Sequence, residues 1–201
     1  MKALIIKYTP REGSNTAKLV VEVEKILSPH YSIELVDLVK NPPEFFLANN
    51  LNAYVKKYLH EKEITPAEEK HLLKLEEYTD QLLRNDLIFL AYPIYNYNMP
   101  GAIRAWLDLI VVAGKTFHYT DYGPVGLLKG KKLIVINTTD SVKPFSSKDY
   151  SSPYIKEMAS FIGIEEVKIT GLFGIKYTGV TPEKLAEFIQ DINSYLNITQ
   201  L

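Results

Sequence analysis

Short apolar runs alternate with amphipathic segments along the whole chain. The apolar runs are rich in β-branched residues and have the length of strands inside a sheet. Five strands are predicted, at residues 3–7, 32–38, 87–92, 132–137 and 167–172. The last three runs lack a polar face, which predicts strands that are buried on both sides.

The segments between these runs carry helix signals. Residues 14–27 repeat apolar side chains at helical spacing. Thr65, Pro66 and Glu68 supply an N-cap, a first-turn proline and a capping-box acid, which predicts a long helix to about residue 83. Further helices are predicted to begin near Pro100, Pro153 and Pro182, the last capped by Thr181.

The alternation of strands and helices predicts an α/β fold with a parallel sheet. Right-handed crossovers leave few topologies, and five strands are most economically wound in the order 2-1-3-4-5, as a three-layer sandwich. A ligand crevice is then expected at the carboxyl ends of strands 1 and 3. The 201 residues fit one domain, so residues 1–201 are predicted to form a single unit.

Composition narrows the functional classes. Cysteine is absent, which excludes disulfides, thiolate nucleophiles and iron–sulfur ligation, so any redox chemistry needs a bound cofactor. A net charge of −1 with scattered basic residues argues against a nucleic-acid partner. No apolar stretch approaches the ~20 residues of a membrane span, and the N-terminal run is too short for a secretion signal, so a soluble, cytoplasmic protein is expected.

The loop after the first strand has the chemistry of a phosphate site. Residues 8–16 read YTPREGSNT and end in Ser14, Asn15 and Thr16 at a helix start. Short hydroxyls, backbone N–H groups and the helix dipole suit a phosphate dianion there. The loop lacks both the GxGxxG and the GK[ST] patterns, which leaves the phosphate of a flavin mononucleotide, FMN. The alternative is that Ser14 only caps the helix.

The loop after the third strand suits a flat ring. Residues 92–101 read YPIYNYNMPG, and tyrosine faces, amide groups and prolines can flank and fix an isoalloxazine. The alternative is an ordinary proline-terminated strand exit whose tyrosines fill a surface groove.

One long stretch adds a resemblance. Residues 93–136, PIYNYNMPGAIRAWLDLIVVAGKTFHYTDYGPVGLLKGKKLIVI, resemble the core signature of the FMN-dependent NADH azoreductases, within the flavodoxin-like NAD(P)H:quinone oxidoreductase family. Residues 153–171, PYIKEMASFIGIEEVKITG, also resemble that family, as does the Ser14–Asn15–Thr16 run. The resemblance covers nearly the whole chain.

The resemblance implies roles for individual positions. The ribityl phosphate would be held by Thr9, Ser14, Asn15 and Thr16, and the flavin would be lined by Ile94, Tyr95, Asn96 and Tyr97. In the third loop the family commonly has a glycine pair, where this chain has Thr138, Thr139, Asp140 and Ser141, which are kept as cofactor-lining candidates. Asp140 has the alternative of a simple turn residue. Phe117 and Phe161 would bind substrate as an aromatic wall over the flavin at a dimer interface, with plain core aromatics as the alternative.

The activity that the resemblance implies is FMN-dependent oxidation of NADH or NADPH. A hydride would pass through flavin N5 to a quinone or azo acceptor by ping-pong turnover in a homodimer. No catalytic side chain and no metal site is predicted, because the four histidines are dispersed. Two alternatives stay open, a flavodoxin-type electron carrier and, with less support, an acyl carrier protein phosphodiesterase, a name that relatives have carried.

Overall fold

Five parallel strands form the central sheet of the computed structural model, which describes residues 1–140, 143–175 and 179–198. The sheet order is β2-β1-β3-β6-β7, and all four neighbouring pairs are parallel. The strands are β1 (Lys2–Lys7), β2 (Ser32–Asp37), β3 (Leu87–Pro93), β6 (Lys132–Thr139) and β7 (Glu166–Phe173). The predicted winding is therefore confirmed for the five expected strands.

The numbering differs from the predicted 2-1-3-4-5 because two further strands precede β6. Strands β4 (Phe117–Thr120) and β5 (Gly123–Gly126) form a separate antiparallel hairpin, which the sequence analysis did not predict. Most of their side chains are exposed, so they lack the apolar run of a buried strand. The hairpin packs closely on the end of α6, where a Cβ on Gly126 would lie 2.1 Å from the amide nitrogen of Gly163.

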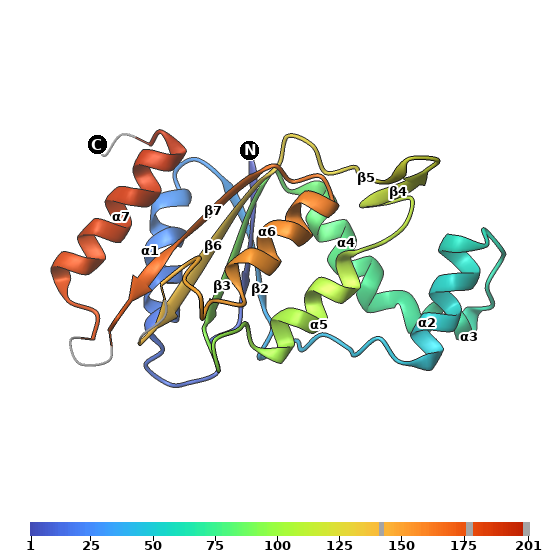
Figure 1. Cartoon of the computed structure of the whole chain (residues 1–201), viewed down its shortest axis with the longest axis horizontal. Helices are drawn as coiled ribbons and strands as arrows, with labels where there is room; N and C mark the ends of the chain where they lie inside the picture. The colour runs from blue at the N-terminus through green and yellow to red at the C-terminus, as the bar shows by residue number, and fades with distance from the viewer. Residues whose placement is uncertain (141–142, 176–178, 199–201) are drawn as a thin grey trace.

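Helices cover both faces of the sheet (Figure 1). Helices α1 (Asn15–Leu27) and α7 (Pro182–Leu196) lie on one face, and α4 (Leu73–Arg84), α5 (Gly101–Ile110) and α6 (Ser152–Phe161) lie on the other. Each face has its own apolar core, one with α1 and α7 and one with α4, α5 and α6. Among the described helices, none has the length and apolar character that crossing a bilayer needs.

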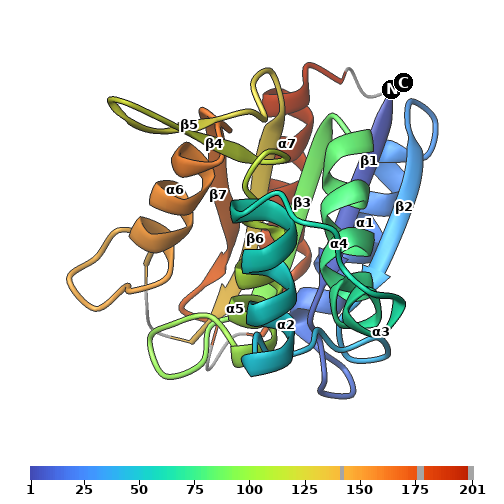
Figure 2. The ribbon, with the colours of Figure 1, turned by 90° about the vertical axis from the view of Figure 1, so that its right-hand side faces the viewer.

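The expected long helix from Pro66 is broken. Its capping box is confirmed, because Thr65 and Glu68 bond reciprocally at the start of α3 (Pro66–Glu69). A 3₁₀ turn, η2 (Lys70–Leu72), then separates α3 from α4. Before this break come α2 (Ala48–Tyr54) and the π-helix η1 (Val55–Leu59). Helix α2 lies at the end of the molecule away from α7 (Figure 1), and it is in front of α5 in the view from that end (Figure 2).

The prediction that the last strand is buried on both sides is wrong. Strand β7 is an edge strand that pairs only with β6, and most of its residues are partly exposed. Strands β3 and β6 in the middle of the sheet are buried along nearly their whole length, as expected. An apolar run thus predicts a strand, but its place in the sheet depends on which neighbours the topology supplies.

Candidate functional site

A polar cleft of about 500 Å³ opens at the carboxyl ends of β1, β3 and β6. This is the edge at which the order of the parallel sheet predicted a crevice. Its walls come from the loops that follow these three strands and from the segment after β7. The lining residues are Pro10, Arg11, Ser14, Asn15, Pro93, Ile94, Tyr95, Asn96, Tyr97, Thr138, Thr139, Asp140 and Ile175.

The first loop brings the start of α1 into the cleft. Ser14 is the N-cap of this helix, and its hydroxyl accepts a hydrogen bond from the Ala17 amide at 3.3 Å. Ser14 and Asn15 both line the cleft, next to the first-turn amides that have no partner within a helix. The positive end of the helix and the nearby Arg11 suit a dianion. Arg11 was not predicted, because a lone exposed arginine carries no pattern.

Thr16 has a different place from the one expected. It is fully buried, it does not line the cleft, and its hydroxyl is 2.6 Å from the Thr138 hydroxyl. This contact joins the start of α1 to the end of β6. Thr16 therefore holds the first and third loops together, while Thr138 itself lines the cleft. Thr9 also lies outside the lining set.

The second loop is a tight turn at the mouth of the cleft. The backbone groups of Tyr95 and Asn98 exchange two hydrogen bonds of 2.9 Å. Asn96 and Tyr97 at the tip have φ values of 50° and 67°, a region that a bulky residue such as tyrosine rarely adopts. Within the described part of the chain, the backbone N–H groups of Asn96 and Tyr97 have no hydrogen-bond partner. These donors are available for the polar edge of a ligand.

The environment of Tyr95 in this turn favours its neutral form, because its pKa is raised from the usual value. Partial burial and the neighbouring Tyr8 raise the pKa of Tyr95, and the positive charge of Arg11 lowers it by less. Tyr95 and Tyr97 remain about two-fifths exposed, at 42% and 45%. Neutral aromatic faces at an open mouth suit a flat ring ligand.

A loop that the sequence analysis did not single out supports the turn from behind. The buried carboxylate of Asp149 accepts hydrogen bonds from the amides of Phe145, Ser151 and Ser152 at 2.7–3.0 Å. The Tyr150 amide donates to the Tyr97 carbonyl at 3.1 Å. Ser146, Ser147 and Lys148 precede Asp149 in a polar stretch that is typical of a surface loop, so no pattern in the sequence predicts this role.

A buried tyrosine continues this support into the sheet. The Tyr92 hydroxyl lies 2.8 Å from the Ser151 hydroxyl, and burial raises the pKa of Tyr92 well above its usual value. Tyr92 is therefore neutral, and its hydrogen bond with Ser151 stabilises the start of the second loop. The strand β3 and the loop before α6 are tied together through it.

The third loop replaces the expected glycine pair with an acidic residue. Thr138, Thr139 and Asp140 line the cleft, and Asp140 is exposed. The Thr138 carbonyl accepts a 3.0 Å hydrogen bond from the Ile94 amide, which joins this loop to the second loop. Ser141, the fourth candidate, lies outside the described residues. Asp140 therefore places one negative charge in a cleft that also holds Arg11.

The two predicted substrate-binding phenylalanines meet each other away from the cleft. Phe117 is the first residue of β4 and Phe161 is the last residue of α6, and their ring centroids are 4.9 Å apart at an interplanar angle of 46°. Neither residue lines the cleft of this chain. Their predicted role as a wall at a dimer interface needs a second copy of the chain and stays a prediction.

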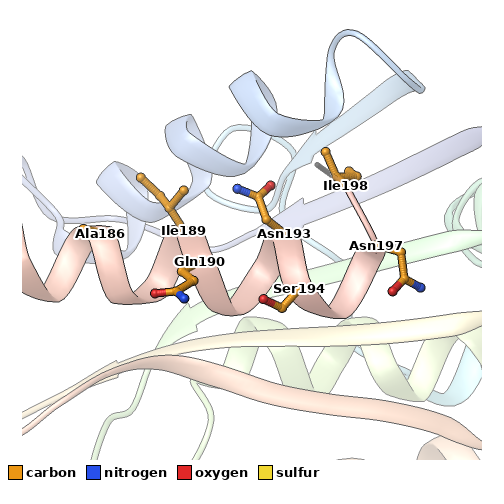
Figure 3. A pocket seen from close by; sticks show the side chains of 7 residues that line it. All are labelled: Ala186, Ile189, Gln190, Asn193, Ser194, Asn197 and Ile198. Carbon is orange, nitrogen blue, oxygen red and sulfur yellow. The ribbon is translucent and has the colours of Figure 1, made fainter. Parts of the chain in front are cut away.

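A larger hollow of about 820 Å³ lies along α7 (Figure 3). It is lined by Ala186, Ile189, Gln190, Asn193, Ser194, Asn197 and Ile198, without a charged side chain. Its lining residues belong to α7 and to the two residues after it, and none of them lies in the loops that line the polar cleft. In the described ranges, no cluster of three acidic or histidine side chains is placed to hold a metal ion. The cleft at the strand ends is therefore the stronger candidate.

Comparison with known proteins assigns this chain to a family. Residues 1–196 match the family described as having a flavodoxin-like fold. FMN-dependent NADH:quinone oxidoreductase 2 of Pseudomonas fluorescens is 32% identical over 187 residues, covering 91% of this chain and 92% of that protein. The FMN-dependent NADH:quinone oxidoreductase of Azotobacter vinelandii is 33% identical over the same share. The chain belongs to the flavodoxin-like family of FMN-dependent NADH:quinone oxidoreductases.

Solved structures agree with this family membership. The FMN-dependent NADH-azoreductase of Bacillus anthracis, solved in complex with FMN, has a TM-score of 0.84, 25% identity and 98% coverage of both chains. For a member of the oxidoreductase family, the cleft here has suitable parts for FMN. It offers a helix N-terminus with short polar side chains, two unpaired turn amides and aromatic faces, in a volume within the roughly 300–1,000 Å³ of small-molecule sites. Among the lining residues that the structure describes, Asp140 is the one whose negative charge opposes an anionic cofactor.

Proposed function

We propose that this protein is an FMN-dependent NADH:quinone oxidoreductase that also reduces azo compounds. The observation that carries the proposal is the convergence of Ser14, Asn15 and the Asn96–Tyr97 turn on one cleft, in a chain of this family. Ser14, Asn15 and the first amides of α1 would hold the phosphate of FMN. The N–H groups of Asn96 and Tyr97 would bind the polar edge of its ring.

The chain supplies placement, while the cofactor supplies the redox chemistry. A bound FMN would supply two-electron hydride chemistry through its N5 atom, between NADH or NADPH and the acceptor. Hydrogen bonds of Tyr150 and Tyr92 hold the turn at residues 94–98 in place. The side of the cleft that Tyr95 and Tyr97 line is open to solvent. We propose that donor and acceptor occupy this open side in turn, which gives ping-pong kinetics without a covalent protein intermediate.

The decisive experiment is anaerobic addition of NADH to FMN-loaded protein. Rapid loss of the yellow flavin absorbance, followed by its return on addition of a quinone, is the expected result. A flavin that stays oxidised with both NADH and NADPH would instead support an electron carrier. Initial rates at several quinone concentrations should give parallel double-reciprocal lines, and converging lines would contradict the proposed alternate occupancy.

We also propose that the protein is a homodimer. Large apolar side chains are exposed on the segment before α3 and on the hairpin, among them Phe45 at 70%, Leu47 at 66% and Tyr119 at 66%. Clusters of exposed apolar side chains are typical of protein interfaces. Sedimentation velocity at micromolar concentration should give the mass of two chains, and a single 22.9 kDa species would contradict this part of the proposal.

A further inference from the structure

Lys148 lies at the rim of the cleft in an arrangement that the sequence did not reveal. Its Nζ is 5.9 Å from the centroid of the Tyr97 ring, and Tyr97 lines the cleft. At this distance a lysine ammonium is attracted to the face of the ring. The positive charge is thus placed beside the aromatic face that a flat ligand would meet.

The backbone on both sides of Lys148 is fixed. The next residue, Asp149, is buried and accepts three backbone hydrogen bonds, and Tyr150 donates to the Tyr97 carbonyl. Lys148 is therefore carried on a loop that is joined to the turn it faces. A surface lysine on an untethered loop would lack such a fixed relation to the cleft.

Lys148 also has no ion-pair partner among the residues that the structure describes. No carboxylate pairs with Lys148 among residues 1–140, 143–175 and 179–198. The neighbouring Asp149 points its carboxylate into the loop, where three amides bind it. Among the described lining residues, Asp140 supplies a carboxylate, and Arg11 supplies a second cation on the loop after β1.

We propose that Lys148 is a specificity-determining residue, which favours ligands that carry an anionic group next to the ring bound in the cleft. The proposal rests on the proposed oxidoreductase function. The anionic group has two possible sources, the pyrophosphate of the dinucleotide donor or a carboxylate or sulfonate on the acceptor. Both present the same chemistry to an ammonium group, and the experiment separates them.

The test compares Lys148→Gln and Lys148→Arg with a control, Lys25→Gln. Lys25 is a 66% exposed side chain at the far end of α1, in the last turn. The first readout needs no turnover: naphthalene-2-sulfonate and 2-naphthol are titrated into the FMN-loaded protein at low salt, and the flavin spectrum reports binding. The second readout is the KM for NADH and for reduced nicotinamide riboside, which lacks the pyrophosphate.

Lys148→Gln should raise the dissociation constant of the sulfonate about twofold to fivefold relative to that of the naphthol, as for an exposed charge pair. Lys148→Arg and Lys25→Gln should keep the wild-type ratio, and added salt should reduce the effect. A selective rise in the KM for NADH would identify the pyrophosphate as the group that Lys148 binds. The proposal is overturned if Lys148→Gln changes neither of two ratios. The first is the dissociation constant of the sulfonate over that of the naphthol, and the second is the KM for NADH over that for reduced nicotinamide riboside. Failure of the proposed function would appear separately, as wild-type flavin that NADH does not bleach.

Discussion

Ser14 performs a structural task and faces the cleft at the same time. It caps α1, and Thr181 caps α7 in the same way through the Lys184 amide. The two residues have the same capping role, but of the two only Ser14 lines the cleft, so Thr181 is a matched control for Ser14. Replacing either with alanine removes one cap, which typically costs about 1 kcal/mol of folding free energy.

Ser14→Ala and Thr181→Ala should lower the free energy of unfolding by similar amounts, about 1 kcal/mol each in urea titrations. Only Ser14→Ala should weaken FMN binding, by roughly tenfold, because a hydrogen bond to a charged group contributes about 1.5–3 kcal/mol. Fluorescence titration with FMN measures this difference. Equal FMN affinity in both variants would show that Ser14 is a cap and nothing more.

Asp140 places a carboxylate where an anionic cofactor would lie. Asp140→Asn should therefore tighten FMN binding about twofold to fivefold, the range for an exposed charge interaction. It should also raise the midpoint potential of bound FMN, because reduction adds negative charge that the carboxylate opposes. Spectroelectrochemistry measures the potential, with Asp121→Asn on the exposed hairpin turn as the control. A lower potential or weaker binding in Asp140→Asn would contradict this account.

The sequence predicted most of the residues that line the cleft, but it did not predict the contacts that hold the loops of the cleft together. Ser14, Asn15 and residues 94–97 have side-chain types and loop positions that predict the site, and all of them line it. The inward placement of Thr16 could not be predicted, because a threonine after a cap suits either a ligand or a buried neighbour. Tyr150 and Lys148 both contact Tyr97, which lies about fifty positions earlier in the chain, and one sequence carries no signal for such contacts.

At the scale of elements, the segment of α2 and η1 is held to α4 by a polar cluster. Glu76 on α4 accepts hydrogen bonds from Lys57 at 2.5 Å and from Tyr58 at 2.8 Å. Burial raises the pKa of Glu76, but these two hydrogen bonds and the charge of Lys57 outweigh it, so the pKa lies below 4.5. The charged form of Glu76 therefore stabilises the fold.

A carboxyl group whose pKa is lower in the folded state than in the unfolded state stabilises the fold at a pH above its unfolded-state pKa. This stabilisation is lost as the pH falls through the folded-state pKa. Glu76→Gln should thus lower the unfolding free energy by about 1 kcal/mol at pH 7, after allowance for partial exposure. The difference from wild type should shrink below about pH 4.5. Urea titrations at pH 7 and at successively lower pH measure it. Glu77→Gln, which breaks only an exposed i,i+3 pair with Lys74, is the control, and an equal loss in both variants would contradict the argument.

The elements that the sequence predicted are those whose stability comes from local pattern and burial. The five parallel strands, α1 and the Thr65 capping box follow from such patterns. The hairpin of β4 and β5 was missed because it depends on packing against α6 through Gly126 and Gly163, which is a tertiary contact. The break at Lys70–Leu72 has no proline or glycine to announce it.

At the scale of the whole molecule, three loops distant in sequence become one site because the parallel sheet brings their strand ends together. The Thr16–Thr138 contact and the Ile94–Thr138 hydrogen bond join all three. In the proposed function, the phosphate of FMN would lie at the start of α1 and its ring would lie at the turn after β3. This division predicts that the phosphate of the cofactor contributes strongly to its affinity.

The most direct measurement is a titration of flavin-free protein with FMN and, in parallel, with riboflavin, followed by flavin fluorescence. FMN should bind at one molecule per chain, and riboflavin, which lacks the phosphate, should bind at least about tenfold more weakly, the equivalent of one charge-assisted hydrogen bond. Equal affinities for the two flavins, or no stoichiometric uptake of FMN, would contradict the account.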